Sequence, residues 1–495
     1  MPNEEQLIEE RKKKREELFK LGINPYPYRY EPTATAEYIK KKYDGLQKDS
    51  ATEDRYRIAG RIMELRRMGK ITFMKLQDHT GRMQAFFSQE NLGKDQYKIL
   101  KLFDIGDWLG VEGKVFTTKT GEITINAEKF DILCKSIRPF PDKWHGLKDV
   151  EARYRKRYLD LIMNPEVMET FVKKTKMINS IREYLNKKKF LEVETPVLQP
   201  IYGGGAARPF TSHLNSLDMK VYLRIANELY LKRLIVGGFP KVYEFARVFR
   251  NEDIDSTHNP EFNSIEIYEA WADMYDMQKM VEELFQEAAK AIHGSTRFEY
   301  QGEIIDVKSP WQSYTMAEAL KKFADIDIDK VTEEDKKRLC EAHKLELGED
   351  FTKGELLQAL FEELVEDKLI QPTHITLHPF ESTPLCKKWR EDPEGPYIER
   401  FEPYIAGMEM ANAYSELNDP IIQRHLLEEQ AKKLRAGKDE EAHPMDEDFV
   451  EAIEYGMPPT GGLGIGIDRM AMVLLNKPSI KEVLPFPFMK ITKKE

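Results

Sequence analysis

The segment GGLGIGIDRM, residues 461–470, spaces its glycines in a way that suits the binding of a flat ligand. Gly462, Gly464 and Gly466 alternate with aliphatic residues, so on a strand all three lie on one face. Glycine weakens a strand interior unless something must approach the bare backbone closely. Adenosine is a reasonable occupant of such a face, and Arg469, at the start of the helix-like run that follows, would stand beside it. By itself, the pattern fits a purely structural strand equally well.

A second segment, FRNEDIDSTHNPEF at residues 249–262, concentrates ionisable side chains between two strand-like runs. The first run ends at Arg250, and the second, SIEIYEAW, begins at Ser264. A solvated surface loop is the commoner explanation for a charged stretch of this kind. The alternative is a functional loop, and the segment alone does not distinguish the two.

Several common site motifs are absent from the sequence. A dinucleotide fingerprint needs GxGxxG between a strand and a helix, and a P-loop needs GxxxxGK followed by Ser or Thr; neither occurs. The three cysteines, Cys134, Cys340 and Cys386, are far apart and form no CxxC or Cys/His spacing. The sequence therefore predicts no zinc site and favours a reducing compartment.

The charge of the 495-residue chain argues against a globally basic nucleic-acid-binding protein, because the formal net charge is -10. Two local clusters are nevertheless basic, RKKKR at 11–15 and EARYRKR at 151–157. Each cluster is either a solvated helix surface or a contact for the backbone of a polyanion. The sequence shows no signal peptide and no run of 18 apolar residues, so we expect a cytoplasmic protein without a membrane-spanning helix.

Residues 56–135 have the alternating pattern of short β-strands. Turn signals such as His79-Thr80-Gly81 separate the runs YRIAGRIMEL, ITFMKLQD, GRMQAFFS, DWLGVEGKVFTT and EITINAEKFDIL. Five short strands in about 80 residues predict a small β-barrel, and the oligonucleotide-binding (OB) fold is the leading candidate. Aromatic and basic residues are interleaved in these runs, so an exposed aromatic side chain could stack on a base.

The remainder of the chain alternates helical and strand-like segments, which predicts a larger α+β domain. Helices are expected at 166–188, 276–293, 315–323, 355–368 and 421–436, and residues 326–350 resemble a helical insertion. We expect four segments: an N-terminal helical arm at 1–50, the OB-type barrel at 51–137, a linker at 138–164 and the larger domain at 165–495.

Three segments together resemble the signature motifs of class II aminoacyl-tRNA synthetases. FLEVETPVLQP at 190–200 resembles motif 1, FRNEDIDSTHNPEF motif 2 and GGLGIGIDRM motif 3, in the right order and behind a barrel that resembles an anticodon-binding domain. Within this class the chain resembles the lysyl-tRNA synthetase family over nearly its full length. The supporting segments are RRMGKITFMKLQD, DKWHGLKDVEARYRKRYLDLI, GGGAARPF, YLRIANELYLKRLIVGGF, HNPEF, NAYSELNDP and GGLGIGIDR.

The resemblance implies a catalytic domain built on a mostly antiparallel sheet with flanking helices. It implies that the chain activates L-lysine with ATP to lysyl-adenylate and transfers lysine to the 3′ end of tRNA(Lys). Arg250 would contact the ATP α-phosphate and the lysine carboxylate, and Arg469 the distal phosphates, as the two catalytic residues. Glu252 would hold the adenine amino group, and Phe262 would stack on the ring. The other ATP-binding residues implied are Asn251, His258, Asn259, Pro260, Glu409, Met410, Gly466, Ile467 and Asp468.

The resemblance also assigns a lysine pocket and a magnesium site. Glu228 and Glu266 would give the pocket its negative charge, and Gly204 would lie in a loop that closes over the substrate amino group. The pocket is completed by Tyr268, Asn412, Tyr414 and Glu416. Glu402 and Glu409 would bind Mg²⁺ together with ATP. Seven residues apart on one strand they would point to opposite faces, so the resemblance implies a turn between them.

In the barrel, the resemblance implies that Phe73, Gln84 and Glu122 read anticodon bases, with Arg66 nearby. Stacking tolerates any base, so discrimination must come from hydrogen bonds. The two basic clusters could follow the tRNA backbone. A homodimer is implied as well, since motif 1 forms the subunit interface in this class.

Other functions fit parts of the sequence. A sister synthetase for aspartate or asparagine would share the barrel and the core, but Glu228 and Glu266 argue against a pocket for an acidic side chain. A paralogue that lysylates a protein would resemble the core without the barrel. A non-catalytic RNA-binding protein would be expected to have lost Arg250, Arg469 or the glutamates, and all are present.

Overall fold

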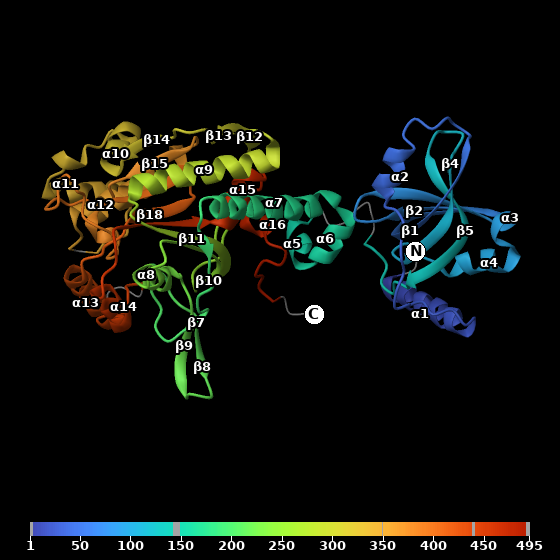
Figure 1. Ribbon diagram of the computed structural model, residues 1–495, viewed down its shortest axis with the longest axis horizontal. Coiled ribbons are helices and arrows are strands. Elements are labelled where there is room, and N and C mark those ends of the chain that lie inside the picture. Colours follow the sequence, from blue (N-terminus) through green and yellow to red (C-terminus); the bar gives the residue numbers. More distant parts are fainter. Residues whose placement is uncertain (1–2, 142–148, 349, 438–440, 492–495) are drawn as a thin grey trace. The chain divides into compact units, whose positions relative to one another are not determined.

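The computed structural model of the chain describes residues 3–141, 149–348, 350–437 and 441–491. It divides into two compact units, Met1–Asp149 and Val150–Glu495 (Figure 1). Of the expected linker 138–164, residues 142–148 lie outside the described residues, and the part from Val150 onward belongs to the second unit.

The first unit contains a closed five-stranded barrel, which confirms the predicted OB-type fold. Its strands are joined in the order β1-β2-β3-β5-β4. Ile62, Met74, Ala85, Val111 and Ile125 are among the buried residues that fill its interior. The strand bounds are β1 Ala51–Met68, β2 Ile71–Gln77, β3 Arg82–Ser88, β4 Trp108–Thr117 and β5 Ile123–Cys134. Between β3 and β4 lie α3 Gln89–Leu92, α4 Lys94–Ile99 and η1 Leu100–Leu102.

The N-terminal helices α1 (Glu4–Lys20) and α2 (Ala36–Lys42) form part of the barrel unit. Leu18 of α1 and Ile39 of α2 are fully buried in the same hydrophobic cluster as the barrel interior. The Arg11 side chain, only 8% exposed, donates hydrogen bonds to the carbonyl oxygens of Ile105 and Arg138. The segment expected as an arm is therefore fastened to the barrel.

The second unit is built on a nine-stranded sheet among its described residues, with the order β14-β15-β16-β18-β19-β11-β10-β6 and β17 paired to β16. Only the pairs β6–β10 and β14–β15 are parallel, so the sheet is mostly antiparallel, as expected. The strand bounds are β6 Leu191–Glu192, β10 Lys241–Phe249, β11 Glu261–Ala270, β14 Gln312–Thr315, β15 Thr373–Thr376, β16 Arg400–Ile405, β17 Met408–Glu409, β18 Ala411–Ser415 and β19 Thr460–Gly466.

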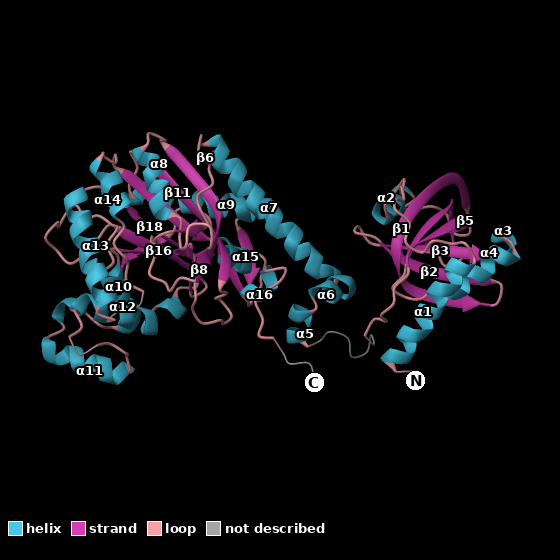
Figure 2. Ribbon diagram, turned by 90° about the horizontal axis from the view of Figure 1, so that it is seen from below, coloured by secondary structure: helices cyan, strands magenta, loops and turns pink. Residues whose placement is uncertain are grey.

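Helices cover both faces of this sheet (Figure 2). On one face α7 (Pro165–Lys187), α9 (Met274–His293) and α15 (Ile467–Leu474) pack on odd-numbered strand residues such as Ile265 and Leu463. On the other, α8 (Glu228–Val236) and α14 (Glu447–Glu454) pack beside Tyr268 and Tyr414. Because side chains alternate along a strand, the even-numbered residues of β11 and β19 share the α8 face.

Smaller elements surround the sheet. A three-stranded sheet contains β7 Leu198–Gln199, β8 Thr211–Leu214 and β9 Met219–Leu223, and a hairpin pairs β12 Arg297–Tyr300 with β13 Glu303–Asp306. The expected insertion at 326–350 contains η2 Ile328–Lys330 and α11 Glu333–His343. It is flanked by α10 Met316–Ala324, α12 Lys353–Leu364 and η3 Glu366–Lys368, and α10 and α12 contribute to a shared apolar cluster with Ile328. The other helices are α5 Val150–Arg155, α6 Arg157–Met163, η4 Phe380–Ser382, α13 Pro420–Arg435 and α16 Ile480–Val483. Within the described ranges no helix is long and apolar enough to cross a membrane.

Candidate active site

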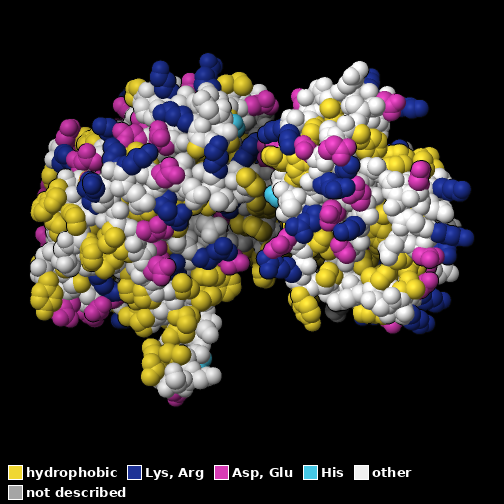
Figure 3. All heavy atoms as spheres, turned by 45° about the vertical axis from the view of Figure 1, so that its right-hand side comes forward, with side chains coloured by type: hydrophobic (Ala, Val, Ile, Leu, Met, Phe, Trp, Pro, Cys, Tyr) yellow, Lys and Arg dark blue, Asp and Glu magenta, His cyan; other side chains and the backbone are white. Residues whose placement is uncertain are grey.

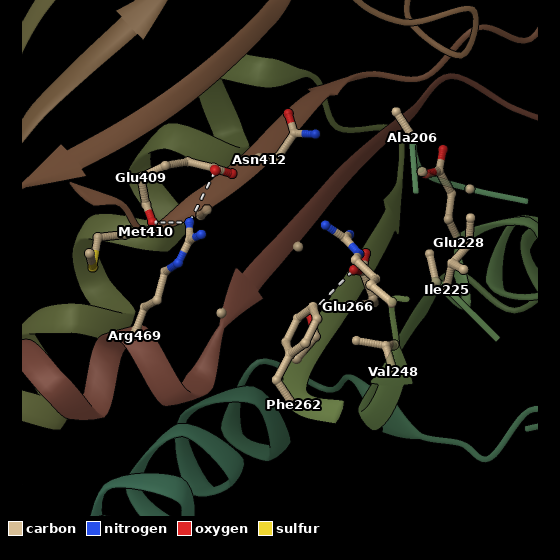
Figure 4. A pocket seen from close by; sticks show the side chains of 18 of the residues that line it. Ala206, Ile225, Glu228, Val248, Phe262, Glu266, Glu409, Met410, Asn412 and Arg469 are labelled. Carbon is tan, nitrogen blue, oxygen red and sulfur yellow. Dashed lines mark hydrogen bonds and ion pairs between the residues drawn. The ribbon is translucent and has the colours of Figure 1, made fainter. Parts of the chain in front are cut away.

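A cavity of about 300 Å³ opens on the α8 face of the nine-stranded sheet. It is lined by the loop before β8, the start of α8, the end of β10, the loop 250–260, and by β11, β16 to β19 and α15. Figure 4 shows Glu409 and Arg469 toward one end of the cavity, Glu228 toward the other and Glu266 between them. The cavity therefore has the paired Arg469 and Glu409 toward one end and the carboxylates of Glu228 and Glu266 farther along the same surface.

The glycines of β19 make room for acidic side chains of the cavity. In the pairing of β11 with β19, Glu266 lies opposite Gly464 and Tyr268 opposite Gly462. A Cβ atom on Gly464 would come within 2.6 Å of Glu266 Oε1, and one on Gly462 within 1.9 Å of Glu416 Oε1. At these two positions the bare strand is explained by the carboxylates that lie over it, and adenosine as a neighbour of the glycine face stays a prediction. At Gly466 a Cβ atom would make only ordinary contacts, the nearest at 3.7 Å from Arg469.

The acidic end brings together three carboxylates. Glu228 is 4% exposed and accepts a hydrogen bond of 2.9 Å from the Tyr414 hydroxyl, while Glu416 is fully buried. Burial raises the pKa of Glu416, the Lys232 ammonium opposes this rise and the Glu228 carboxylate adds to it. Burial also raises the pKa of Glu266 to about 8, and Glu228 contributes to that shift by charge repulsion. This end of the cavity is suited to a cation.

Arg250 follows the end of β10 with unused hydrogen-bonding capacity. Its Nε atom is buried and has no hydrogen-bond partner among the described residues, and its guanidinium carbon lies 5.3 Å from the centre of the Phe262 ring. Burial raises the pKa of neighbouring Glu252, and the charge of Arg250 opposes this. An unpaired buried N–H donor is costly, so a ligand oxygen is the natural partner of Arg250.

Arg469 at the start of α15 is held by two neighbours. Its Nη1 atom donates to Glu409 Oε2 at 3.1 Å and to the Glu409 carbonyl at 3.0 Å, and Nη2 lies 2.9 Å from His258 Nε2. The other ring nitrogen of His258 lies 2.8 Å from Asp255. Burial opposes the ionisation of Asp255, but hydrogen bonds from Thr257 and His258 outweigh it and lower its pKa to about 2. The loop between β10 and β11 is thus linked to Arg469 through His258.

The same loop is tied to the C-terminal part of the chain. The Ile480 N–H donates to the Ser256 carbonyl at 2.7 Å, and the Phe488 N–H donates to Asn259 Oδ1 at 3.2 Å. Asn259 is buried and also donates to the Glu261 carbonyl at 2.6 Å. The polar segment 249–262 therefore begins and ends on strands, forms part of the cavity wall and is not merely a solvated loop.

A tight hairpin carries Glu402 and Glu409. Strands β16 and β17 pair Tyr404 with Glu409 across a turn at Ala406-Gly407, both of which have positive φ. Glu402 and Tyr404 share a face of β16, and Glu409 lies opposite Tyr404, so both glutamates lie on the same face. This is the turn that the resemblance implies. Two hard oxygen donors on one face fit a divalent cation that takes its other ligands from a phosphate.

Most of the predicted site residues meet in this cavity. Those that line it are Gly204, Glu228, Arg250, Glu252, His258, Asn259, Phe262, Glu266, Tyr268, Glu402, Glu409, Met410, Asn412, Tyr414, Glu416, Gly466, Asp468 and Arg469. Three predicted ATP contacts are not among the lining residues. Asn251 is exposed and its N–H donates to the Arg208 carbonyl, the Pro260 carbonyl accepts from Arg250, and the Ile467 side chain is fully buried in the hydrophobic core.

Asp468 lines the cavity, but its carboxylate oxygens are bound by other groups of the protein. It pairs with the Lys174 ammonium of α7 and accepts from the Asn263 N–H at 2.8 Å. Its side chain is 2% exposed. The geometry gives Asp468 the role of fixing α15, and with it Arg469, against β11 and α7.

Two charged residues of the site were missed from sequence. Arg400 of β16 donates to Asn412 Oδ1 at 2.9 Å and to Glu402, and so orients both. Lys232 of α8 is fully buried and pairs with Glu228 and Glu416. The separation of four residues between Glu228 and Lys232 on a helix could have indicated the first of these pairs. No sequence signal indicates the second, because Glu416 is far away in the chain.

On the barrel, strand pairing places Arg66 opposite Phe73 and Phe73 opposite Phe86. Phe73 is half-buried, with its ring centre 5.0 Å from that of Phe86. Gln84 is 7% exposed and donates to Thr124 Oγ1 at 3.0 Å, so only part of its amide is available to a base. Glu122 and Arg66 are exposed. The predicted reading residues thus lie on β1, β2 and β3 and in the turn before β5.

The basic cluster 151–157 is largely occupied within the second unit. Arg157 is 1% exposed and donates to the carbonyls of Lys481, Leu484 and Pro485, and Arg155 donates to the Lys490 carbonyl. Arg153 pairs with Asp160. Arg155 and Arg157 thus help to hold the C-terminal segment, whereas Lys156 is exposed, and a contact of this cluster with the tRNA backbone stays a prediction.

Comparison with known proteins agrees with this geometry. Residues 149–490 match the family described as tRNA synthetases class II (D, K and N), and residues 56–133 match the OB-fold nucleic acid binding domain. The lysine–tRNA ligase of Clostridium novyi is 49% identical over 98% of this chain and 95% of its own length. That of Pelotomaculum thermopropionicum is 51% identical, with the same coverage, and that of Moorella thermoacetica is 48% identical over 98% of both chains. The chain therefore belongs to the lysine–tRNA ligase family of the class II tRNA synthetases.

Proposed function

We propose that the chain activates L-lysine with ATP and transfers it to tRNA(Lys). The observation that carries the assignment is that the carboxylates of Glu228, Glu266 and Glu416 line one cavity together with Arg250 and Arg469. An ammonium side chain fits the carboxylates of Glu228, Glu266 and Glu416, whereas the acidic side chain of aspartate would be repelled. The relatives that cover almost the whole chain carry the same activity in their names.

Activation joins a lysine carboxylate oxygen to the α-phosphorus of ATP and breaks the bond to the departing pyrophosphate. The carboxylate is already ionised at neutral pH, so the site needs charge stabilisation more than a base. Arg250 would bind the α-phosphate and the substrate carboxylate, Arg469 the distal phosphates, and Phe262 the adenine ring. In the second step a ribose hydroxyl at the tRNA 3′ end attacks the lysyl carbonyl carbon and AMP leaves.

Magnesium fits the paired carboxylates of the hairpin. Glu402 and Glu409 would hold the ion together with ATP oxygens, and its charge would neutralise the phosphates. Among the described residues no cluster of three or more His, Cys, Asp or Glu side chains could hold a metal, so the phosphates would have to complete the ligand set. Arg469 and Glu409 are paired in the structure, so the arginine that would bind the distal phosphates lies directly beside a carboxylate that would hold the ion.

For tRNA, we propose that the barrel face of Arg66, Phe73, Gln84 and Glu122 reads the anticodon. Phe73 supplies a stacking surface beside an exposed cation, which suits a single-stranded base. Arg153, Arg155 and Arg157 already have partners within the second unit, so the barrel is the better supported contact for tRNA. The three cysteines are free, which suits the reducing cytoplasm as the place of action.

We further propose that the chain forms a homodimer through the region of motif 1. Hydrophobic side chains gather on the β8–β9 hairpin in Figure 3. Leu217 is 67% exposed, and Leu198 of β7, in motif 1, is 52% exposed. Contiguous exposed apolar surface commonly marks a protein interface. Sedimentation of the Leu198→Asp and Leu217→Asp variants should show monomers if these residues lie in the dimer contact.

The decisive experiment is pyrophosphate exchange into ATP with each of the twenty amino acids, followed by charging of tRNA(Lys). Exchange that depends on lysine alone, with charging of tRNA(Lys), supports the proposal. Exchange with aspartate or asparagine would identify a sister synthetase. Lysine-dependent exchange with transfer to a protein and none to tRNA would identify a protein-lysylating enzyme.

A further inference from the structure

The most unusual charge near the lysine pocket is a buried lysine that belongs to the protein. Lys232 lies on α8, one turn after Glu228, and is fully buried. Its ammonium pairs with Glu228 Oε1 and with Glu416 Oε2, which come from an α-helix and from the end of β18. Both carboxylates line the cavity, whereas Lys232 is not among the lining residues.

Lys232 occupies one oxygen of each carboxylate. On Glu228 the same Oε1 atom also accepts from Tyr414, so Oε2 is left, 3.5 Å from where a Cβ atom on Gly204 would stand. On Glu416, Oε1 is buried without a hydrogen-bond partner in the described part of the chain and lies over bare Gly462. An unpartnered buried carboxylate oxygen is costly, so it marks a place where a ligand donor belongs.

The charge of Lys232 survives its burial. Desolvation lowers the pKa of a buried ammonium, but the two carboxylates outweigh this and leave the pKa of Lys232 raised. Two carboxylates and one ammonium carry a net charge of one negative unit. When Glu228 and Glu416 are both ionised, one substrate ammonium neutralises these three groups, whereas a neutral side chain adds no charge to them; Glu266 is a separate acid of the pocket.

We propose that Lys232 is a positioning residue for amino-acid specificity, which aims one oxygen each of Glu228 and Glu416 at the substrate and reduces their joint charge to match one ammonium group. This inference rests on the proposed function. It does not make Lys232 a catalytic residue, since Lys232 acts only through the two glutamates.

A buried ion pair can also be purely structural, and the chain offers a matched control for that possibility. Lys135 of the barrel unit is likewise buried and pairs with two carboxylates, Asp104 and Asp107. Lys135→Met removes a charge from an equivalent environment in the other unit. We expect it to lower thermal stability without changing the KM for lysine.

The test compares four full-length proteins in addition to the parent: Lys232→Met, Glu416→Gln, the double variant and Lys135→Met. Each is assayed by pyrophosphate exchange with lysine and with norleucine, a neutral amino acid of similar shape. Lys232→Met should lower kcat/KM for lysine by about 30-fold or more, as removal of one partner from a buried charged pair does. The KM for ATP should stay within about threefold of the parent, a change worth less than about 1 kcal/mol.

The double variant gives the sharper result. Glu416→Gln alone leaves Glu228 neutralised by Lys232, so this set keeps no net charge and Glu266 alone is left to balance the substrate ammonium. Removing Lys232 as well frees Glu228 for the substrate ammonium and restores the net charge of one negative unit. The double variant should therefore activate lysine about tenfold better than Glu416→Gln, within the coupling expected for contacting residues. A structural salt bridge predicts no such recovery.

The outcomes separate the inference from the function on which it rests. A parent without lysine-dependent exchange would overturn the proposed function. A parent with normal exchange and a double variant no better than Glu416→Gln would overturn the role of Lys232 alone. If Lys232→Met does not fold, the comparison of Glu416→Gln with the double variant still decides. Failure of the double variant to fold, with Glu416→Gln folded, would make Lys232 a structural residue and also overturn the inference.

Discussion

Glu266 lies directly opposite Gly464 in the antiparallel pairing of β11 and β19, and its carboxylate fills the space that a side chain at position 464 would need. The two residues therefore act together: the Glu266 carboxylate can occupy its position because residue 464 of the facing strand has no side chain. We therefore predict that specificity in this pocket depends on a glycine as much as on a charge.

Gly464→Ala should impair lysine use while sparing ATP. The new methyl group would come within 2.6 Å of Glu266 Oε1 and displace it, and overpacking of this kind costs about 1–3 kcal/mol. We expect the KM for lysine to rise by roughly 5- to 150-fold. Gly466→Ala, two positions along the same face, makes only ordinary contacts and serves as the control. Equal effects of both changes on lysine would contradict the pairing with Glu266.

Glu266→Gln tests the charge at the same position. If the carboxylate meets the substrate ammonium, the change keeps the shape and removes the charge, at a cost of about 2–5 kcal/mol. The kcat/KM for lysine should fall on the order of 30- to 4,000-fold, and norleucine should suffer less. Pyrophosphate exchange with both amino acids measures this. Lysine activation that survives within about threefold would show that Glu266 does not read the ammonium.

Lysine binding should release a proton at neutral pH. The pKa of Glu266 is raised from 4.5 to about 8, so at pH 7 its carboxyl is mostly protonated in the free protein. A bound ammonium favours the ionised form, so part of a proton, up to one, should leave per lysine bound. Calorimetry in buffers of different ionisation enthalpy measures this release, and Glu266→Gln should abolish it. A parent that releases no proton would mean that Glu266 stays neutral when lysine binds.

The raised pKa of Glu266 also makes the stability of the fold depend on pH. The unfolded carboxyl ionises near 4.5 and the folded one near 8, so the folded state binds more protons between these values. The free energy of unfolding should therefore fall as the pH rises from 4.5 to 8. Glu266→Gln lacks this loss, so its melting temperature should exceed that of the parent by an amount that grows across this range. A constant difference between the two proteins would contradict the raised pKa.

Arg250→Lys should nearly abolish activation although it keeps the charge. Lysine is a point charge and cannot replace a planar contact with two oxygens. We expect a loss on the order of 100-fold or more in pyrophosphate exchange, equivalent to about 3 kcal/mol. Arg247→Lys is the matched control, because Arg247 lies near the end of β10, three residues before Arg250, is exposed and faces Glu261 at 3.4 Å. Near-normal exchange by Arg250→Lys would remove Arg250 from the reaction.

Phe73→Ala should weaken tRNA charging and leave lysine activation intact. Phe73 belongs to the first compact unit, whereas residues of the second line the cavity, and loss of one base stack costs roughly 1–3 kcal/mol. Phe87→Ala is the control, since Phe87 is fully buried in the barrel core and its truncation should lower the melting temperature. Equal losses in exchange and in charging by Phe73→Ala would show that its ring serves only the core.

Regular patterns in the sequence predicted the architecture well. The five alternating runs form the closed barrel, and the helix expected at 166–188 is found at Pro165–Lys187. These patterns are local, because burial on one face imposes a period on neighbouring residues. The resemblance located most of the cavity residues because its motifs are also local, each being a short continuous segment of the sequence.

Contacts between distant segments could not be predicted in this way. The sequence indicated that Gly462 and Gly464 share a face, but not that the occupants of that face would be Glu416 and Glu266. Lys232 is on α8, and its buried partner Glu416 comes from a distant part of the chain, directly after β18. Likewise, the sequence did not indicate that Arg155 and Arg157 donate hydrogen bonds to backbone carbonyls of the C-terminal segment, which is far away in the chain.

The position of β19 has a consequence for synthesis of the chain. This strand lies in the middle of the nine-stranded sheet, between β18 and β11, yet it is the last of the described strands to leave the ribosome. Until residue 466 has emerged, β11 and β18 each present an unpaired edge, and such edges invite association with other chains. A nascent chain that stalls after β18 would thus expose both edges at once. Completion of the sheet and completion of the pocket are therefore the same late event, and the acidic residues meet their glycines only when almost the whole polypeptide has been made.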